Sequence, residues 1–141
     1  MTADRRDTLR DLVMSTARGL RRRWVDALQP WQLSPHEYRA LHVVGHSADD
    51  APRLGDVAKA LRIAPRSATE VVDRLQDRGL VERIPDAQDR RATCIRLTTD
   101  GRRTLHELQE AREADADDYF AALDDEDRAA LRRILERLRR P

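Results

Sequence analysis

Arginine and hydroxyl side chains near the middle of the chain have the types and spacing of a DNA-binding surface. A helix is predicted to begin at Pro65, where a proline loses no hydrogen bond, and to end at Gly79. Arginine can form two hydrogen bonds with guanine, and glutamate can accept a hydrogen bond from cytosine. Serine and threonine can bind a phosphate or a base. The start and outward face of this helix therefore give the DNA-binding candidates Pro65, Arg66, Ser67, Thr69, Glu70 and Arg74.

A second group of cations lies in a polar loop between two short predicted strands. Residues 80–84 and 93–97 have apolar side chains at near-alternate positions, as half-buried strands do, and the loop over residues 85–92 joins them. The loop carries Arg90 and Arg91, and arginine suits the negative potential of a narrow minor groove. Both are therefore further DNA-contact candidates.

Other chemically active residues do not make a complete site. His42 and His46 are about one helical turn apart, a spacing that can hold a metal, but nothing fixes further ligands nearby, so no metal site or cofactor is predicted. Cys94 is the only cysteine, which excludes a disulfide within the chain, and we expect it to be a small buried side chain. The chain has no glycine-rich phosphate loop and no organised nucleophile and base, so no enzyme is predicted.

Helices are the elements that must position these residues. Apolar residues at helical spacing predict a helix over residues 54–61, and a tight turn leads from it to Pro65. A long amphipathic helix is predicted from about Asp4 to Leu28, and a second begins at Pro35 after the N-cap Ser34. Two more helices are predicted over about residues 100–120 and 124–139. The order in the middle of the chain is helix, turn, helix, hairpin, which is that of a winged helix-turn-helix.

The sequence closely resembles the MarR family of bacterial transcriptional regulators. Asp89-Arg90-Arg91 matches the family's Asp-x-Arg wing signature, and Leu97 to Gly101 matches its Leu-Thr-x-x-Gly exit from the wing. The resemblance implies a mainly α fold with a small β wing. It implies an N-terminal dimerisation helix over residues 1–32, a winged helix-turn-helix DNA-binding domain over residues 33–99, and C-terminal dimerisation helices over residues 100–141.

Two local features of the wing also follow from the resemblance. Asp89 cannot favour DNA, and the resemblance implies that it shapes the loop through an ion pair or backbone hydrogen bonds. Arg53 and Leu54 are expected to add a short third strand to the wing sheet. Both features would hold the wing arginines in place.

The terminal helices carry apolar stripes that the small central core cannot cover. The economical solution is that they pack against the same helices of a second copy. A two-fold dimer also suits DNA, because two identical binding units fit a palindrome whose half-sites are about one helical turn apart. Between Thr104 and Asp127 ten acidic residues stand against one arginine, so this stretch is expected to face away from DNA.

Members of this family often hold a small lipophilic or phenolic effector between the DNA-binding unit and the dimer helices. The residues where we expect such a pocket are Trp24, Trp31, Tyr38, Arg39 and His42. Arg62, which follows the first helix of the helix-turn-helix, is expected to make a pocket wall there more polar than such ligands favour.

Composition agrees with a single compact domain carrying extra helices. The chain has 141 residues, 40% hydrophobic and 38% charged, with a net charge of +1. We find no apolar run long enough to span a membrane and no signal-peptide pattern, so a cytoplasmic protein is expected. The leading hypothesis is a dimeric, sequence-specific DNA-binding repressor released by a ligand. The alternative is a winged-helix module that binds a protein partner, and the cations at both groove-facing positions argue against it.

Overall fold

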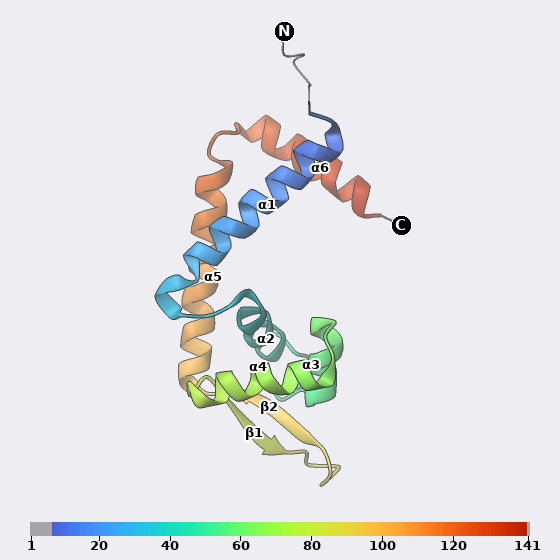
Figure 1. The fold of residues 1–141 in the computed structure, drawn as a ribbon, viewed down its shortest axis with the longest axis vertical. Helices are drawn as coiled ribbons and strands as arrows, with labels where there is room; N and C mark the ends of the chain where they lie inside the picture. The colour runs from blue at the N-terminus through green and yellow to red at the C-terminus, as the bar shows by residue number, and fades with distance from the viewer. Residues whose placement is uncertain (1–6, 141) are drawn as a thin grey trace.

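The computed structural model describes residues 7–140, and within them the chain forms six α-helices, one short 3-10 helix and two strands. Asp4, the expected start of the first helix, lies outside the described residues. The predicted fold class, mainly α with a small β wing, is confirmed, and Figure 1 shows the wing and the terminal helices at opposite ends. In chain order the elements are α1 (Leu9–Ala27), η1 (Gln29–Trp31), α2 (Pro35–Gly45), α3 (Leu54–Leu61), α4 (Pro65–Asp77), β1 (Val81–Pro85), β2 (Thr93–Leu97), α5 (Thr99–Phe120) and α6 (Asp125–Arg139).

Capping residues determine where the first two helices begin. The side chain of Thr8 accepts a hydrogen bond from the Asp11 amide at 3.2 Å, and the Asp11 carboxylate accepts from the Thr8 amide at 3.1 Å. This reciprocal pair starts α1 at Leu9. The helix α2 begins at Pro35, as predicted, because Ser34 caps it and the proline needs no partner for a missing N–H.

The hydrophobic core surrounds α2, which packs against α3, α4, α5 and β2. Its side chains come from the predicted apolar faces of these helices and from the inner face of the wing. The helix-turn-helix and the wing are therefore fixed to one another through a shared core. The largest fully buried side chains are Leu28, Leu41, Leu61, Leu75, Ile95, Leu108, Val57, Val72 and Val81.

The wing is a two-stranded antiparallel hairpin. Its register pairs Val81 with Leu97 at the base and Pro85 with Thr93 near the tip. The expected third strand is present only at Arg53, which makes an isolated antiparallel bridge to Cys94 of β2, and Leu54 has no part in it. Since Leu54 already begins α3, the chain turns into a helix before it can extend along β2.

Two glycines permit the close turns around the wing. Gly79 has a φ of +72°, a left-handed conformation that ends α4 as predicted. At Gly101, in the first turn of α5, a Cβ atom would lie 1.9 Å from the carbonyl oxygen of Leu80. The helix α5 therefore starts directly against the turn that leads into β1, which only glycine allows.

The two terminal helices, α1 and α6, lie at the end of the molecule away from the wing, and we call them the arms (Figure 1). Arg23 of α1 binds Asp115 and Asp118 of α5, at 2.9 and 2.8 Å. Large apolar side chains of α1 and α6 nevertheless face solvent, with Leu9 83% and Leu138 72% exposed. No helix among residues 7–140 is long and apolar enough to cross a membrane.

Candidate nucleic-acid interface

The two helices of the helix-turn-helix are joined by three residues, 62–64. Arg62 ends α3 in the left-handed conformation, with a φ of 55°, and its amide donates to the carbonyl of Lys59. This sharp turn brings α4 across α3, and it directs Arg62 into solvent, away from the pocket formed by α1, α2 and α5. The expectation that Arg62 makes that pocket more polar is therefore wrong.

One face of α4 is buried and the opposite face is open. Ala68, Val71, Val72 and Leu75 enter the core, at the spacing of a single helical face. Thr69 is half-buried and its hydroxyl donates to the carbonyl of Pro65 at 3.0 Å, so this hydroxyl already has a partner within the helix. The other DNA-binding candidates on this helix are exposed: Pro65, Arg66, Ser67, Glu70 and Arg74.

Hydrogen bonds to two aspartates shape the wing loop. The carboxylate of Asp89 accepts from the amide of Arg91 at 3.0 Å, which is one of the two ways in which it was expected to shape the loop. Asp86 accepts from the amide of Gln88 at 2.8 Å, and the Asp86 amide donates to Ala92 at 3.1 Å. The loop is thereby closed on itself, and the side chains of Arg90 and Arg91 are left exposed at its tip.

Asp86 was not singled out from the sequence, yet it connects the wing to α3. Its carboxylate lies 2.6 Å from the guanidinium of Arg53, the N-cap residue of α3. The Gln88 amide, and after it Arg53, hold the pKa of Asp86 below its usual value. The sequence contains little to predict this ion pair. Pro85-Asp86 indicates a turn, but Arg53, the partner of Asp86, is 33 residues away.

Ion pairs separate the arginines of this region into two groups. Within residues 7–140 the structure gives Arg66, Arg90, Arg91 and Arg102 no acidic partner. Asp73 of α4 pairs with Arg83 of β1, not with Arg74 beside it. Besides Arg53, the arginines here that do have acidic partners are Arg74 with Glu37 at 3.5 Å, Arg78 with Glu37 at 3.9 Å, Arg83 with Asp73 at 2.6 Å, Arg96 with Glu82 at 2.6 Å and Arg103 with Asp100 at 2.9 Å.

A pocket of about 360 Å³ lies between α1, α2 and α5. Arg112 of α5 reaches over the rings of Trp24 and Tyr38, at 5.9 and 5.7 Å from their centres. Trp31 does not line this pocket, because its indole N–H donates to Glu107 at 3.2 Å. The residues that line it are Trp24, Pro35, Tyr38, Arg39, His42, Val43 and Arg112.

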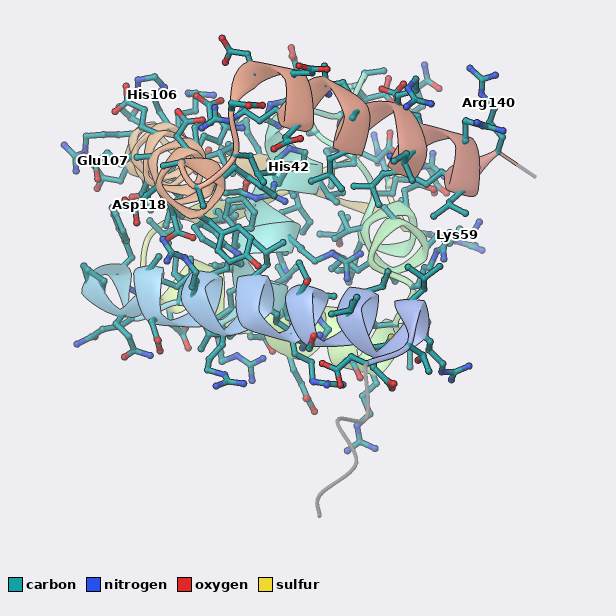
Figure 2. The ribbon with its side chains drawn as sticks, turned by 90° about the horizontal axis from the view of Figure 1, so that it is seen from above. His42, Lys59, His106, Glu107, Asp118 and Arg140 are labelled. Atoms are coloured by element: carbon teal, nitrogen blue, oxygen red, sulfur yellow. The ribbon has the colours of Figure 1, made fainter. Side chains whose placement is uncertain are left out.

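His42 and His46 stack on one another, with ring centres 4.2 Å apart. One ring nitrogen of His46, Nδ1, donates to the His42 carbonyl at 3.0 Å, and the other accepts from the Gln109 amide at 3.2 Å. Burial, followed by the charges of His46 and Arg112, lowers the pKa of His42. In Figure 2, His42 is seen within the outline between α1 and α6, whereas His106 lies on the outer side of α5.

No group of three metal-ligating side chains comes together in the part of the chain that the structure describes. His106 pairs instead with Glu110 of the same helix, at 3.2 Å. Cys94 lies on β2 and is buried, as expected, and burial raises the pKa of its thiol. A protonated, covered thiol is a poor nucleophile.

Comparisons with known proteins agree with this architecture. A sequence model of the MarR family matches residues 31–92, which run from the end of η1 to the wing loop. The HTH-type transcriptional regulator YsmB of Bacillus subtilis (strain 168), described as uncharacterized, is 27% identical over 113 residues, which are 80% of this chain and 76% of that protein.

Solved structures have the same fold over nearly the whole chain. A MarR family protein from Bacillus stearothermophilus is 26% identical with a TM-score of 0.80, over 92% of this chain and 89% of that one. A mutant MarR from E. coli, solved in complex with operator DNA, is 20% identical with a TM-score of 0.75, over 92% and 91% of the two chains. Residues 31–92, which hold the helix-turn-helix and the first strand and loop of the wing, therefore match the MarR family of transcriptional regulators, and the chain has the fold of a solved MarR family protein over nearly its whole length.

Proposed function

We propose that this protein is a dimeric regulator of transcription that places α4 in the major groove and the wing in the adjacent minor groove of a palindromic operator. The observation that carries the proposal is that the positive charges of Arg66, Arg90 and Arg91 are open to solvent. All three are exposed and without an acidic partner among residues 7–140, and they lie on the two elements that a winged helix-turn-helix presents to DNA. Such side chains can bind phosphates or bases without first giving up an ion pair.

The start of α4 supports the same orientation. Its N-cap is Ala64, whose side chain accepts no hydrogen bond, and Pro65 has no N–H. The N–H groups of Arg66 and Ser67 therefore have no side-chain acceptor at the cap and can donate to a phosphate at the positive end of the helix. Within this proposal, base contacts come from Arg66, Ser67, Thr69, Glu70 and Arg74, with Thr69 turning its hydroxyl away from Pro65.

A second copy of the chain is the partner that we propose for the two arms. Dimer formation is typical of the family, and α1 and α6 expose apolar side chains that nothing in residues 7–140 covers. Burying a leucine stabilises an interface by about 1.5–3 kcal/mol, so the several exposed here can support a stable dimer. The exposed apolar residues are Leu9, Leu12, Val13, Met14, Ile134, Leu135 and Leu138.

The pocket between α1, α2 and α5 is the proposed effector site. Arg39 and Arg112 supply positive charge, and Trp24 and Tyr38 supply aromatic surface, a combination that fits a lipophilic or phenolic anion. Since the pocket lies where the arms meet the core, a ligand there would change the spacing of the two α4 helices and release the operator. This makes the protein a ligand-responsive repressor.

A mobility shift of the purified protein on the DNA flanking its own gene tests the function. We expect a complex with one dimer per palindrome that survives unrelated competitor DNA and weakens steeply with salt. Complexes that unrelated DNA removes equally from every sequence, or no complex, would contradict the proposal and favour a protein-binding module.

A further inference from the structure

Glu37 is the one buried charged side chain among residues 7–140, with 9% of it exposed, and the proposed DNA contacts do not use it. Its carboxylate lies 3.5 Å from Nε of Arg74 and 3.9 Å from Nη1 of Arg78, both on or at the end of α4. It also accepts from the hydroxyl of Ser34 at 3.2 Å. A buried charge is costly unless it is paired, so this cluster favours the arrangement in which α4 stays over the start of α2.

Arg78 extends the cluster to the segment that joins α1 to α2. Its guanidinium donates to the carbonyl of Gln32 at 2.7 Å and to the carbonyl of Trp31. Trp31 in turn donates its indole N–H to Glu107 of α5, which Figure 2 shows at the side of that helix. A continuous line of polar contacts thus runs from α4, through η1, to the helix that continues into the arms.

The apolar contacts of α4 do not fix its direction by themselves. Hydrophobic burial is non-directional, so a helix held only by Val71, Val72 and Leu75 can rock on the core with little loss. Hydrogen bonds to charged groups depend strongly on angle and distance. The hydrogen bonds of Arg78 to the carbonyls of Gln32 and Trp31 are directional in this way, and the ion pairs of Glu37 keep the guanidinium groups of Arg74 and Arg78 on the α2 side. Together they supply the orientation that the apolar face lacks.

We propose that Glu37 is a positioning residue: through Arg74 and Arg78 it holds α4 at a fixed angle to the arms and so determines which spacing of operator half-sites the dimer accepts. The inference rests on the proposed function, in which the arms join two copies of α4 across a two-fold axis. In such a dimer any rotation of α4 relative to the arms changes the distance between the two DNA-binding surfaces. A well-held α4 gives one preferred spacing, and a loosely held one tolerates several.

The test measures affinity as a function of half-site spacing. The probe is the palindrome that the wild-type protein selects from random-sequence DNA, together with versions in which one or two base pairs are inserted or removed at its centre. Glu37→Gln keeps the size of the side chain and removes its charge. We expect its affinity for the operator with the best spacing to fall about tenfold. Its affinity for the operators with inserted or removed base pairs should fall less, so that the difference in affinity between spacings becomes smaller.

Two further variants make the result specific. Arg78→Lys keeps the charge but cannot hold two carbonyls with one planar group, so it should flatten the preference in the same direction. Glu110→Gln removes an exposed carboxylate of α5 that pairs with His106, and it should keep the wild-type profile.

The outcomes separate this inference from the proposed function. A Glu37→Gln protein with a lower melting temperature but an unchanged spacing preference would show a merely structural role and overturn the inference alone. If Glu37→Gln does not fold, the profile of Arg78→Lys decides in the same way. A wild-type protein that selects no palindrome would overturn the proposed function and this inference with it.

Discussion

Arg91 combines a backbone contact that shapes the wing with a side chain that is open to solvent. Its amide donates to Asp89, whereas its guanidinium has no acidic partner within residues 7–140. Replacement by alanine keeps the backbone hydrogen bond to Asp89 and removes the exposed guanidinium. We therefore predict that Arg91→Ala lowers operator affinity about tenfold without changing the melting temperature. A mobility shift and a thermal melt on the same preparation measure the two effects.

The control for this prediction is Arg22→Ala, which removes an exposed arginine of α1, outside the helix-turn-helix and the wing. It should bind the operator as the wild type does. If Arg91→Ala also binds unchanged, the wing has no part in DNA binding.

His42 gives the protein a pH dependence of known sign. Burial lowers the pKa of His42 in the folded chain, whereas in the unfolded chain its pKa is about 6.5. As the pH falls below about 6.5, the unfolded chain takes up a proton more readily than the folded one, so the free energy of unfolding decreases. The stabilisation is therefore complete at neutral pH and lost progressively in acid.

Thermal melts from about pH 7.5 to about pH 5.5 test this. The melting temperature of His42→Gln should fall less over this range than that of the wild type. His36→Gln changes an exposed histidine of the same helix and should retain the wild-type dependence. A wild-type slope in His42→Gln would mean that other groups cause the acid sensitivity.

Among the elements, the junction between the wing and α5 depends on one glycine. An alanine at Gly101 would place its Cβ 1.9 Å from the Leu80 carbonyl, so α5 or the turn must shift. Overpacking of this kind costs about 1–3 kcal/mol. We predict that Gly101→Ala lowers the free energy of unfolding by that amount in urea denaturation.

The matched control is Gly55→Ala in α3, where an added Cβ meets no atom within 4 Å. There alanine should raise stability by about 0.5–1 kcal/mol, because glycine loses more conformational freedom in a helix. Equal effects of the two substitutions would contradict the close approach at Gly101.

The sequence predicted the ends of helices more successfully than it predicted contacts between residues far apart in the chain. The starts of α2 and α4 and the end of α4 followed from Pro35, Pro65 and Gly79, because each acts on its own stretch of backbone. The expected strand at Arg53 and Leu54 is reduced to one bridge because α3 begins at Leu54, and no local pattern predicts which of the two elements takes that residue. The ion pairs of Asp86 with Arg53 and of Glu37 with Arg74 join residues more than thirty positions apart, and no local pattern encodes them.

The pocket shows the same limit. Four of the five residues proposed for it from the sequence line it, since three of them lie on α2 and follow its periodicity. The fifth, Trp31, instead contacts Glu107, and no pattern in the sequence pointed to Arg112, which also lines the pocket. Which side chains of α5 face the pocket depends on how α5 crosses α2, and that crossing is a property of the assembled core.

At the scale of the whole molecule, the arms make a prediction about assembly. Leu138 is 72% exposed, so replacing it in a single chain removes almost no contact. If α6 packs on a second copy, Leu138→Glu forces a charge into that interface and should weaken the dimer at least about tenfold while the melting temperature of the monomer changes little. Sedimentation equilibrium over a range of protein concentrations measures the dissociation constant.

The control substitution, Ala60→Glu, places the same charge on an exposed position of α3 and should leave the dimer intact. The consequence for DNA follows from symmetry. A dimer that holds both half-sites binds far more tightly than a monomer on one half-site. Leu138→Glu should therefore need a higher protein concentration for half-saturation of the operator, and its binding curve should be steeper. An unchanged dissociation constant for Leu138→Glu would mean that the exposed face of α6 is not the dimer interface.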